Sequence, residues 1–150
     1  IAFSLAILLG LFMHVDPTVD AIVNRTAVGM GDIALALAAG VAGALAFTRG
    51  VPASLVGVMV AVALLPPVVV VALLIVAQEP RGAYHAFLLG LTNVICVNLA
   101  GVATFLVQGI APTNWWEAAR AKRATWVAIG IWLALLCALV LAITFAPQPA

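Results

Sequence analysis

The most hydrophobic stretch of the chain is LVGVMVAVALLPPVVVVALLIVA, residues 55–77, which carries two adjacent prolines at its centre. An uncharged run of this length is sufficient to cross the roughly 30 Å hydrocarbon core of a bilayer as one helix. Pro66 and Pro67 lack the N–H groups that would bond to the carbonyls of Val62 and Ala63. Carbonyls freed at membrane depth are tolerated only where protein or water meets them. We therefore predict a transmembrane segment that is broken at the proline pair.

The composition of the whole chain agrees with a membrane location. Of 150 residues, 67% are hydrophobic and only 7% are charged, with a mean hydropathy of +1.30. Soluble domains carry roughly 25% charged residues, so this chain is too apolar to cover a water-facing surface. Its few charges are scattered, which excludes a basic patch for nucleic acid. Cys96 and Cys137 lie in apolar runs without metal or redox spacing. We expect no metal and no cofactor.

Apolar segments recur along the chain at a spacing typical of a transmembrane helical bundle. With residues 55–77 they number about five, the others being 1–13, 33–48, 86–107 and 125–145. Segment 1–13 is too short to span, and it resembles the end of a longer span, so we expect a fragment of a larger bacterial protein. The sequence predicts an all-α, polytopic transmembrane domain over residues 1–150.

The connections between these segments suggest an orientation in the cell membrane. Residues 14–32 form an outer loop with a short interfacial helix from Pro17 to about Asn24, and 49–53 and 78–85 form turns. The longest polar connection after the first, 108–123, is predicted to be cytoplasmic because basic residues favour that side and tryptophan favours the membrane boundary. The residues concerned are Trp115, Trp116, Arg120, Lys122 and Arg123. Charge counts do not decide whether 55–77 crosses once or turns back.

Small residues recur at four-residue intervals in segment 33–48. They form two stripes, Ala36, Gly40 and Ala44 on one and Ala39 and Gly43 on the other. Such surfaces let helix backbones approach closely in a membrane. The partner helix belongs either to the same subunit or to a second copy, and we expect a homo-oligomer.

Polar side chains inside the apolar segments are the candidates for function. Thr92, Asn93 and Asn98 lie within 86–107, and the two amides are strong donors at the depth of the freed carbonyls. They serve either interhelical hydrogen bonding or a polar path through the bundle. Asp32 is expected to be the N-cap of segment 33–48 or an ion or proton ligand, and Arg25, seven residues earlier, could pair with it in either case.

The order of these motifs resembles a known family. The RTAVGMGD lead, the small-residue segment, VAVALLPP, TNVICVN and PTNWWE follow one another between residues 24 and 117 as in the bacterial and archaeal family of domain of unknown function 389. The resemblance implies a polytopic membrane protein, with further hydrophobic segments and a soluble region before the part seen here, and no established activity. It implies a signature of Arg25, Thr26, Asp32, Pro66, Pro67, Asn93 and Asn98.

No catalytic motif accompanies these features, so we expect no enzyme. The leading hypothesis is a transporter or channel for a small solute or ion, lined by 55–77 and 86–107, with Asp32, Arg25 and Thr26 near its outer mouth. One alternative is a membrane scaffold or sensor whose activity lies in the soluble region. Another is a lipid-handling protein that holds anionic head groups beside Trp115 and Trp116.

Overall fold

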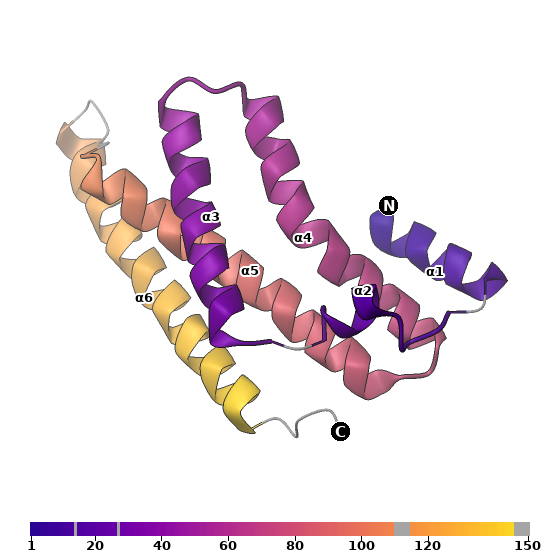
Figure 1. Cartoon of the computed structure of the whole chain (residues 1–150). Coiled ribbons are helices and arrows are strands. Elements are labelled where there is room, and N and C mark those ends of the chain that lie inside the picture. Colours follow the sequence, from indigo (N-terminus) through magenta and orange to yellow (C-terminus); the bar gives the residue numbers. More distant parts are fainter. Residues whose placement is uncertain (14, 27, 110–114, 146–150) are drawn as a thin grey trace.

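The structure is a computed structural model that describes residues 1–13, 15–26, 28–109 and 115–145. All regular structure within these ranges is helical, which confirms the predicted fold class. The helices in these ranges, labelled in Figure 1, are α1 (Ala2–Phe12), α2 (Asp20–Val23), α3 (Met30–Thr48), α4 (Ala53–Val76), α5 (Pro80–Val107) and α6 (Trp115–Phe145). Side chains of residues 59, 115–122 and 145 are not among those described.

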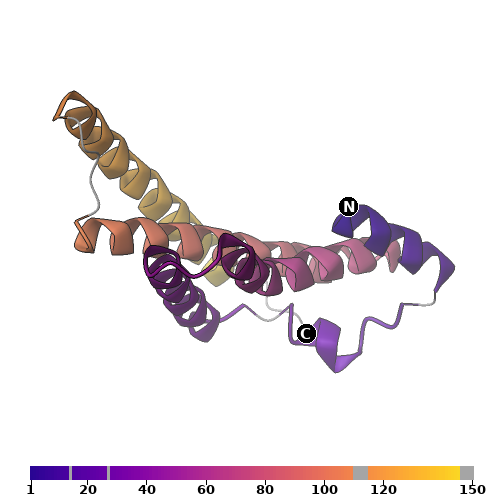
Figure 2. The same ribbon diagram turned by 90° about the horizontal axis from the view of Figure 1, so that it is seen from above.

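The centre of the bundle is α5, which packs against α3, α4 and α6, while α1 packs against α4. Successive long helices run in alternating directions, so the α3–α4 connection and the start of α6 share one end of the bundle (Figure 1). The α4–α5 turn lies at the other end, near α2. Seen from above, α3 and the first half of α6 lie on opposite sides of α5 (Figure 2).

Among the described residues, four helices are long and apolar enough to cross a membrane: Met30–Thr48, Ala53–Val76, Pro80–Val107 and, within α6, Arg123–Thr144. The shortest has 19 residues. At 1.5 Å per residue it is about 28 Å long, which nearly matches the thickness of the hydrocarbon core. With 11 residues, α1 is shorter than a span, as the sequence predicted. The chain is a membrane protein with a helical-bundle fold.

The helix α4 continues through the proline pair without interruption. Both prolines lie inside it, and it ends at Val76 with Ala77 as its C-cap, before Gln78 takes a left-handed backbone conformation with φ 58°. The prolines thus interrupt the hydrogen-bond ladder, and the helical path is kept. Residues 55–77 do not turn back, and the predicted break is confined to the ladder.

Three predicted boundaries were wrong. The turn at 78–85 is shorter, because α5 begins at Pro80, whose ring is pre-set for the first helical position and whose missing N–H is not needed there. The connection 108–123 is shorter as well, because α6 begins at Trp115. The interfacial helix extends over Asp20–Val23, later than the predicted start at Pro17.

Two hydrophobic clusters hold the helices together. One joins α2, α4 and α5 through Ile22, Val70, Leu74, Ala83 and Ala86. The other joins α5 and α6 through Leu88, Ile95 and Leu139. Large apolar side chains such as Leu35, Val62 and Trp126 remain exposed on the outside, which suits a surface that faces lipid.

Candidate functional site at the proline pair

A hydrogen bond links α5 to the turn of α4 that precedes the proline pair. The Asn93 Nδ2 group donates to the Ala63 carbonyl at 3.0 Å. This carbonyl would accept from position 67 in a regular helix, but Pro67 has no N–H. The side chain of Asn93 is half-buried, so the bond forms away from bulk water. A donor from one helix thereby replaces the donor that proline removed from its neighbour.

The same region of α5 packs against the proline ring. Pro67 is fully buried, and Gly90 faces it at a distance where a Cβ at position 90 would make ordinary contact, 3.4 Å from the Pro67 Cβ. Gly90 lies three residues before Asn93, on a neighbouring part of the helix surface. Gly90 thus lies against the ring while Asn93 reaches the freed carbonyl. Sequence reasoning missed Gly90, although its spacing from Asn93 was a usable signal.

A small apolar cavity of about 230 Å³ lies beside this contact. Its walls come from α4 and α5 and consist of Leu64, Pro67, Val68, Val71, Ala86, Phe87, Gly90, Leu91 and Val94. Val68, Phe87 and Leu91 in its lining are exposed, so the cavity opens toward the outside of the bundle. The proline pair, Asn93 and this cavity together form the candidate site.

Thr92, Asn98 and Thr104 of α5 bond within their own helix. Thr92 is fully buried and its Oγ1 donates to the Leu88 carbonyl at 2.8 Å. Asn98 is exposed, and its Nδ2 donates to the Val94 carbonyl at 2.7 Å. Thr104 donates in the same way to Ala100. Of the two predicted amides, only Asn93 is brought to the proline pair.

Asp32 lies one turn deeper in its helix than predicted. The helix α3 begins at Met30, so Gly29 is the N-cap and Asp32 is the third helical residue. Its Oδ2 accepts from the Gly29 N–H at 2.9 Å, which satisfies a free donor at the helix start. In the described part of the chain no ion pair joins Asp32 to Arg25, which is exposed. The predicted pairing is therefore wrong.

Thr26, the neighbour of Arg25, belongs to the α2 end of the bundle. Its Oγ1 donates to the Val23 carbonyl at 2.8 Å. Its methyl group faces the start of α5, 3.8 Å from where a Cβ on Gly82 would be. Asp32, Arg25 and Thr26 are thus separate from the proline pair.

The first small-residue stripe packs within the chain. Ala36, Gly40 and Ala44 are buried, and a Cβ on Gly40 would lie 2.7 Å from the Val97 carbonyl oxygen of α5. The second stripe differs, because Ala39 is exposed and Gly43 has open space in front of it. The interface role of Trp115, Trp116, Arg120 and Lys122 depends on side chains that lie outside those described, while Arg123 is exposed.

Comparison with known proteins places these features in a family. Residues 1–99 match the family described as Domain of unknown function (DUF389). The chain belongs to the DUF389 family. The matched part begins earlier than the resemblance over residues 24–117 suggested and ends before PTNWWE. It contains all seven predicted signature residues, from Arg25 to Asn98, and therefore the whole candidate site.

A relative from an archaeon extends the match beyond the DUF389 region. "Uncharacterized protein MJ0678" of Methanocaldococcus jannaschii is 34% identical over 141 residues. The aligned part covers 94% of this chain and 44% of that relative, so the chain spans less than half of the relative's length. No solved structure matches the chain.

Proposed function

We propose that this DUF389 chain is part of a membrane domain that passes a small solute or ion. The observation that supports the proposal is the hydrogen bond from Asn93 to the Ala63 carbonyl beside an apolar cavity. Transporters use interrupted membrane helices whose freed backbone groups lie at membrane depth. Here one such group is held by a single side chain, which is a contact that a small helix movement would open.

The proline pair gives α4 a defined place to bend. Two consecutive ladder bonds are missing, so the helix halves on either side of Pro66 and Pro67 are joined by fewer constraints than in a regular helix. A bend there would change the distance between α4 and α5 at Gly90, where the cavity lies. Opening of the Asn93 contact would then widen the cavity and expose the Ala63 carbonyl to a solute.

The sequence supplies the membrane location, orientation and assembly that we propose for the domain. We place the domain in the cell membrane with the 108–123 region on the cytoplasmic side, as the positive charges there favour. The bilayer is its surrounding partner, and no nucleic acid or catalytic reaction is involved. The stripe of Ala39 and Gly43, which α5 leaves uncovered, is where a second copy would pack in a homo-oligomer.

Flux through reconstituted vesicles tests the proposal. Proteoliposomes are mixed with glycerol and followed by light scattering, and proton entry is followed with trapped pyranine. We expect protein-dependent entry of at least one probe, reduced by Gly90→Leu, which fills the cavity, and altered by Asn93→Leu. Gly101→Leu is the matched control, because Gly101 is on the same helix with open space in front of it. If glycerol and protons enter as fast with Gly90→Leu and Asn93→Leu as with the wild type, the proposed route is contradicted.

A scaffold is the second candidate, and one observation favours it. Thr92, Asn93, Asn98 and Thr104 each bond to a backbone carbonyl within this chain. Such bonds satisfy the polar groups without any solute. A folded wild-type protein that lets neither glycerol nor protons enter would support the scaffold and contradict the transporter.

A further inference from the structure

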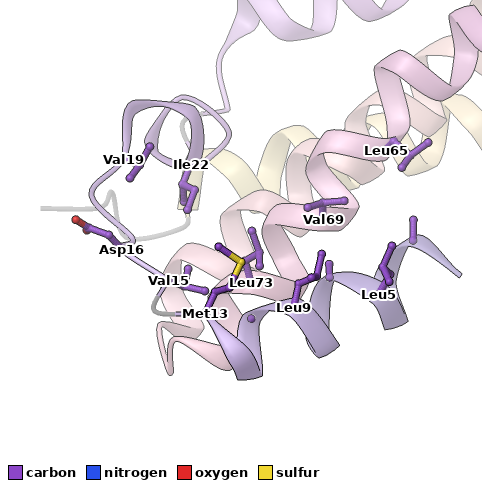
Figure 3. A pocket seen from close by; sticks show the side chains of 13 residues that line it. Leu5, Leu9, Met13, Val15, Asp16, Val19, Ile22, Leu65, Val69 and Leu73 are labelled. Carbon is purple, nitrogen blue, oxygen red and sulfur yellow. The ribbon is translucent and has the colours of Figure 1, made fainter.

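A groove of about 450 Å³ lies between α1, the segment 15–22 and the second half of α4 (Figure 3). Its walls are almost wholly apolar and include Leu5, Leu9, Met13, Leu65, Val69 and Leu73. Asp16 lies at its rim, but Figure 3 shows the carboxylate turned away from the groove, and Thr18 donates to it through both N–H and hydroxyl. The inner surface of the groove is therefore hydrocarbon-like.

The groove extends over about the depth of one leaflet of a bilayer. Its lining along α4 runs from Leu65 to Leu73, a rise of about 12 Å at 1.5 Å per residue. This is a little less than half of the ~30 Å hydrocarbon thickness. Its deep end lies beside Leu65, next to the proline pair at the middle of α4, and its shallow end lies at the end of α4. An acyl chain of one leaflet extends over the same depth.

The shallow end of the groove adjoins a second pocket of about 330 Å³ with a different character. The two share Gly10, Met13 and Val15, and the second pocket adds Val76, Ala77 and Gln78. These three residues are the C-terminal end of α4, where the last carbonyls of a helix have no ladder partner. The Val76 carbonyl in particular lacks a ladder donor, because the residue four positions later is Pro80, which has no N–H. The second pocket thus presents hydrogen-bond acceptors.

The polarity of these acceptors selects the head group. The C-terminus of a helix carries a partial negative charge and favours a cation that can donate hydrogen bonds. A primary ammonium does both, a quaternary ammonium has no N–H to donate, and a phosphate or glycerol head group brings no cation. The apolar groove and the acceptor pocket form one continuous site with a hydrocarbon end and a polar end, in the orientation of a membrane lipid.

We infer that this site binds one phospholipid with a primary ammonium head group, of the phosphatidylethanolamine type. One acyl chain lies between α1 and α4, and the ammonium donates to the carbonyls at the end of α4. The site is at the opposite end of α4 from the Arg49 connection. It is separate from the cavity beside Gly90 and does not depend on the proposed flux.

Native mass spectrometry of the full chain in detergent tests the inference. The protein is mixed with equimolar dioleoyl phosphatidylethanolamine, phosphatidylcholine and phosphatidylglycerol, and the retained lipids are counted. One hydrogen bond gained, at about 1 kcal/mol, predicts retention of phosphatidylethanolamine about fivefold above phosphatidylcholine. Gln78→Lys, which adds a cation to the acceptor pocket, should shift the preference toward phosphatidylglycerol.

A matched pair of substitutions locates the lipid. Leu5→Trp fills the groove, whereas Leu8→Trp places the same side chain on the same helix outside it, and the two leucines are 54% and 52% exposed. We expect Leu5→Trp to lose the retained lipid and Leu8→Trp to keep it. Equal retention by the two variants, or equal retention of all three lipids by the wild type, overturns the inference. A protein dimer that Leu5→Trp dissociates also overturns it, because a second copy then occupies the groove.

Discussion

The central helix α5 is held to two of its neighbours, α3 and α4, in two different ways. Against α3, it offers a smooth surface on which Gly40 lies so close that a Cβ would be 2.7 Å from the Val97 carbonyl oxygen and 2.8 Å from the Ala100 Cβ. Against α4, it offers Asn93, whose amide bonds to a carbonyl freed by proline. The α3–α5 contact depends on Gly40 having no side chain, and the α4–α5 contact depends on the side chain of Asn93.

This difference determines how much each contact tolerates movement of the helices relative to each other. Close packing of backbones gains from dispersion over many atoms and has no alternative arrangement nearby. A single hydrogen bond across a gap in a helix can open and reform with water or a solute. The α3–α5 contact is therefore expected to be the rigid part of the bundle, and the α4–α5 contact the adjustable part.

The largest effect is expected from filling the rigid contact. Gly40→Leu forces α3 away from Val97 and Ala100, because the clash is with backbone and Cβ atoms that have no room to move. We expect a loss of about 3 kcal/mol or more in the free energy of unfolding, measured by denaturation in mixed micelles. Gly43→Leu is the control, since nothing lies in front of Gly43. Equal stability of the two variants would refute the close packing.

The next effect comes from removing the amide at the adjustable contact. Asn93→Leu leaves the Ala63 carbonyl without its donor, and we expect a loss of about 1–2 kcal/mol in the same assay. Asn98→Leu should change stability by less than about 0.5 kcal/mol, because Asn98 is exposed and bonds only within its own helix. If Asn98→Leu were the more damaging change, the assignment of Asn93 as the interhelical donor would be wrong.

The smallest effect is expected at Gly90, and it sharpens the comparison with Gly40. A Cβ at position 90 meets only the Pro67 Cβ at 3.4 Å, which is ordinary contact. Alanine is also more favourable than glycine inside a helix by about 1 kcal/mol. We expect Gly90→Ala to leave stability within about 0.5 kcal/mol of wild type or slightly above it, whereas Gly40→Ala lowers it. Thermal unfolding of both variants side by side measures this difference, and a severe loss at Gly90 would contradict the looser contact.

Much of this arrangement was predictable from the sequence. Proline chemistry identified the carbonyls of Val62 and Ala63 as freed, and the scarcity of donors at that depth pointed to Asn93 and Asn98. The choice between them needed the structure, because it depends on how α5 is rotated against α4. The same holds for the stripe of Gly40, which either a second copy or α5 could have covered.

Other features were beyond sequence reasoning. The continuity of α4 through Pro66 and Pro67 is supported by Asn93, which supplies one of the two missing bonds, and periodicity does not reveal this. The start of α5 at Pro80 was missed because Gln78, Glu79 and Arg81 read as a polar turn. The groove beside α1 arises from a gap between helices distant in sequence, and no local pattern signals it.

A double-mutant cycle at Pro67 and Asn93 tests the central claim most directly. Pro67→Ala restores an N–H four residues after Ala63, so the carbonyl no longer needs Asn93. We predict that Asn93→Leu costs about 1–2 kcal/mol in the wild-type background and close to zero in the Pro67→Ala background, a coupling well above the usual error of additivity. An unchanged cost of Asn93→Leu in the two backgrounds would contradict the claim that Asn93 replaces the donor that proline removes.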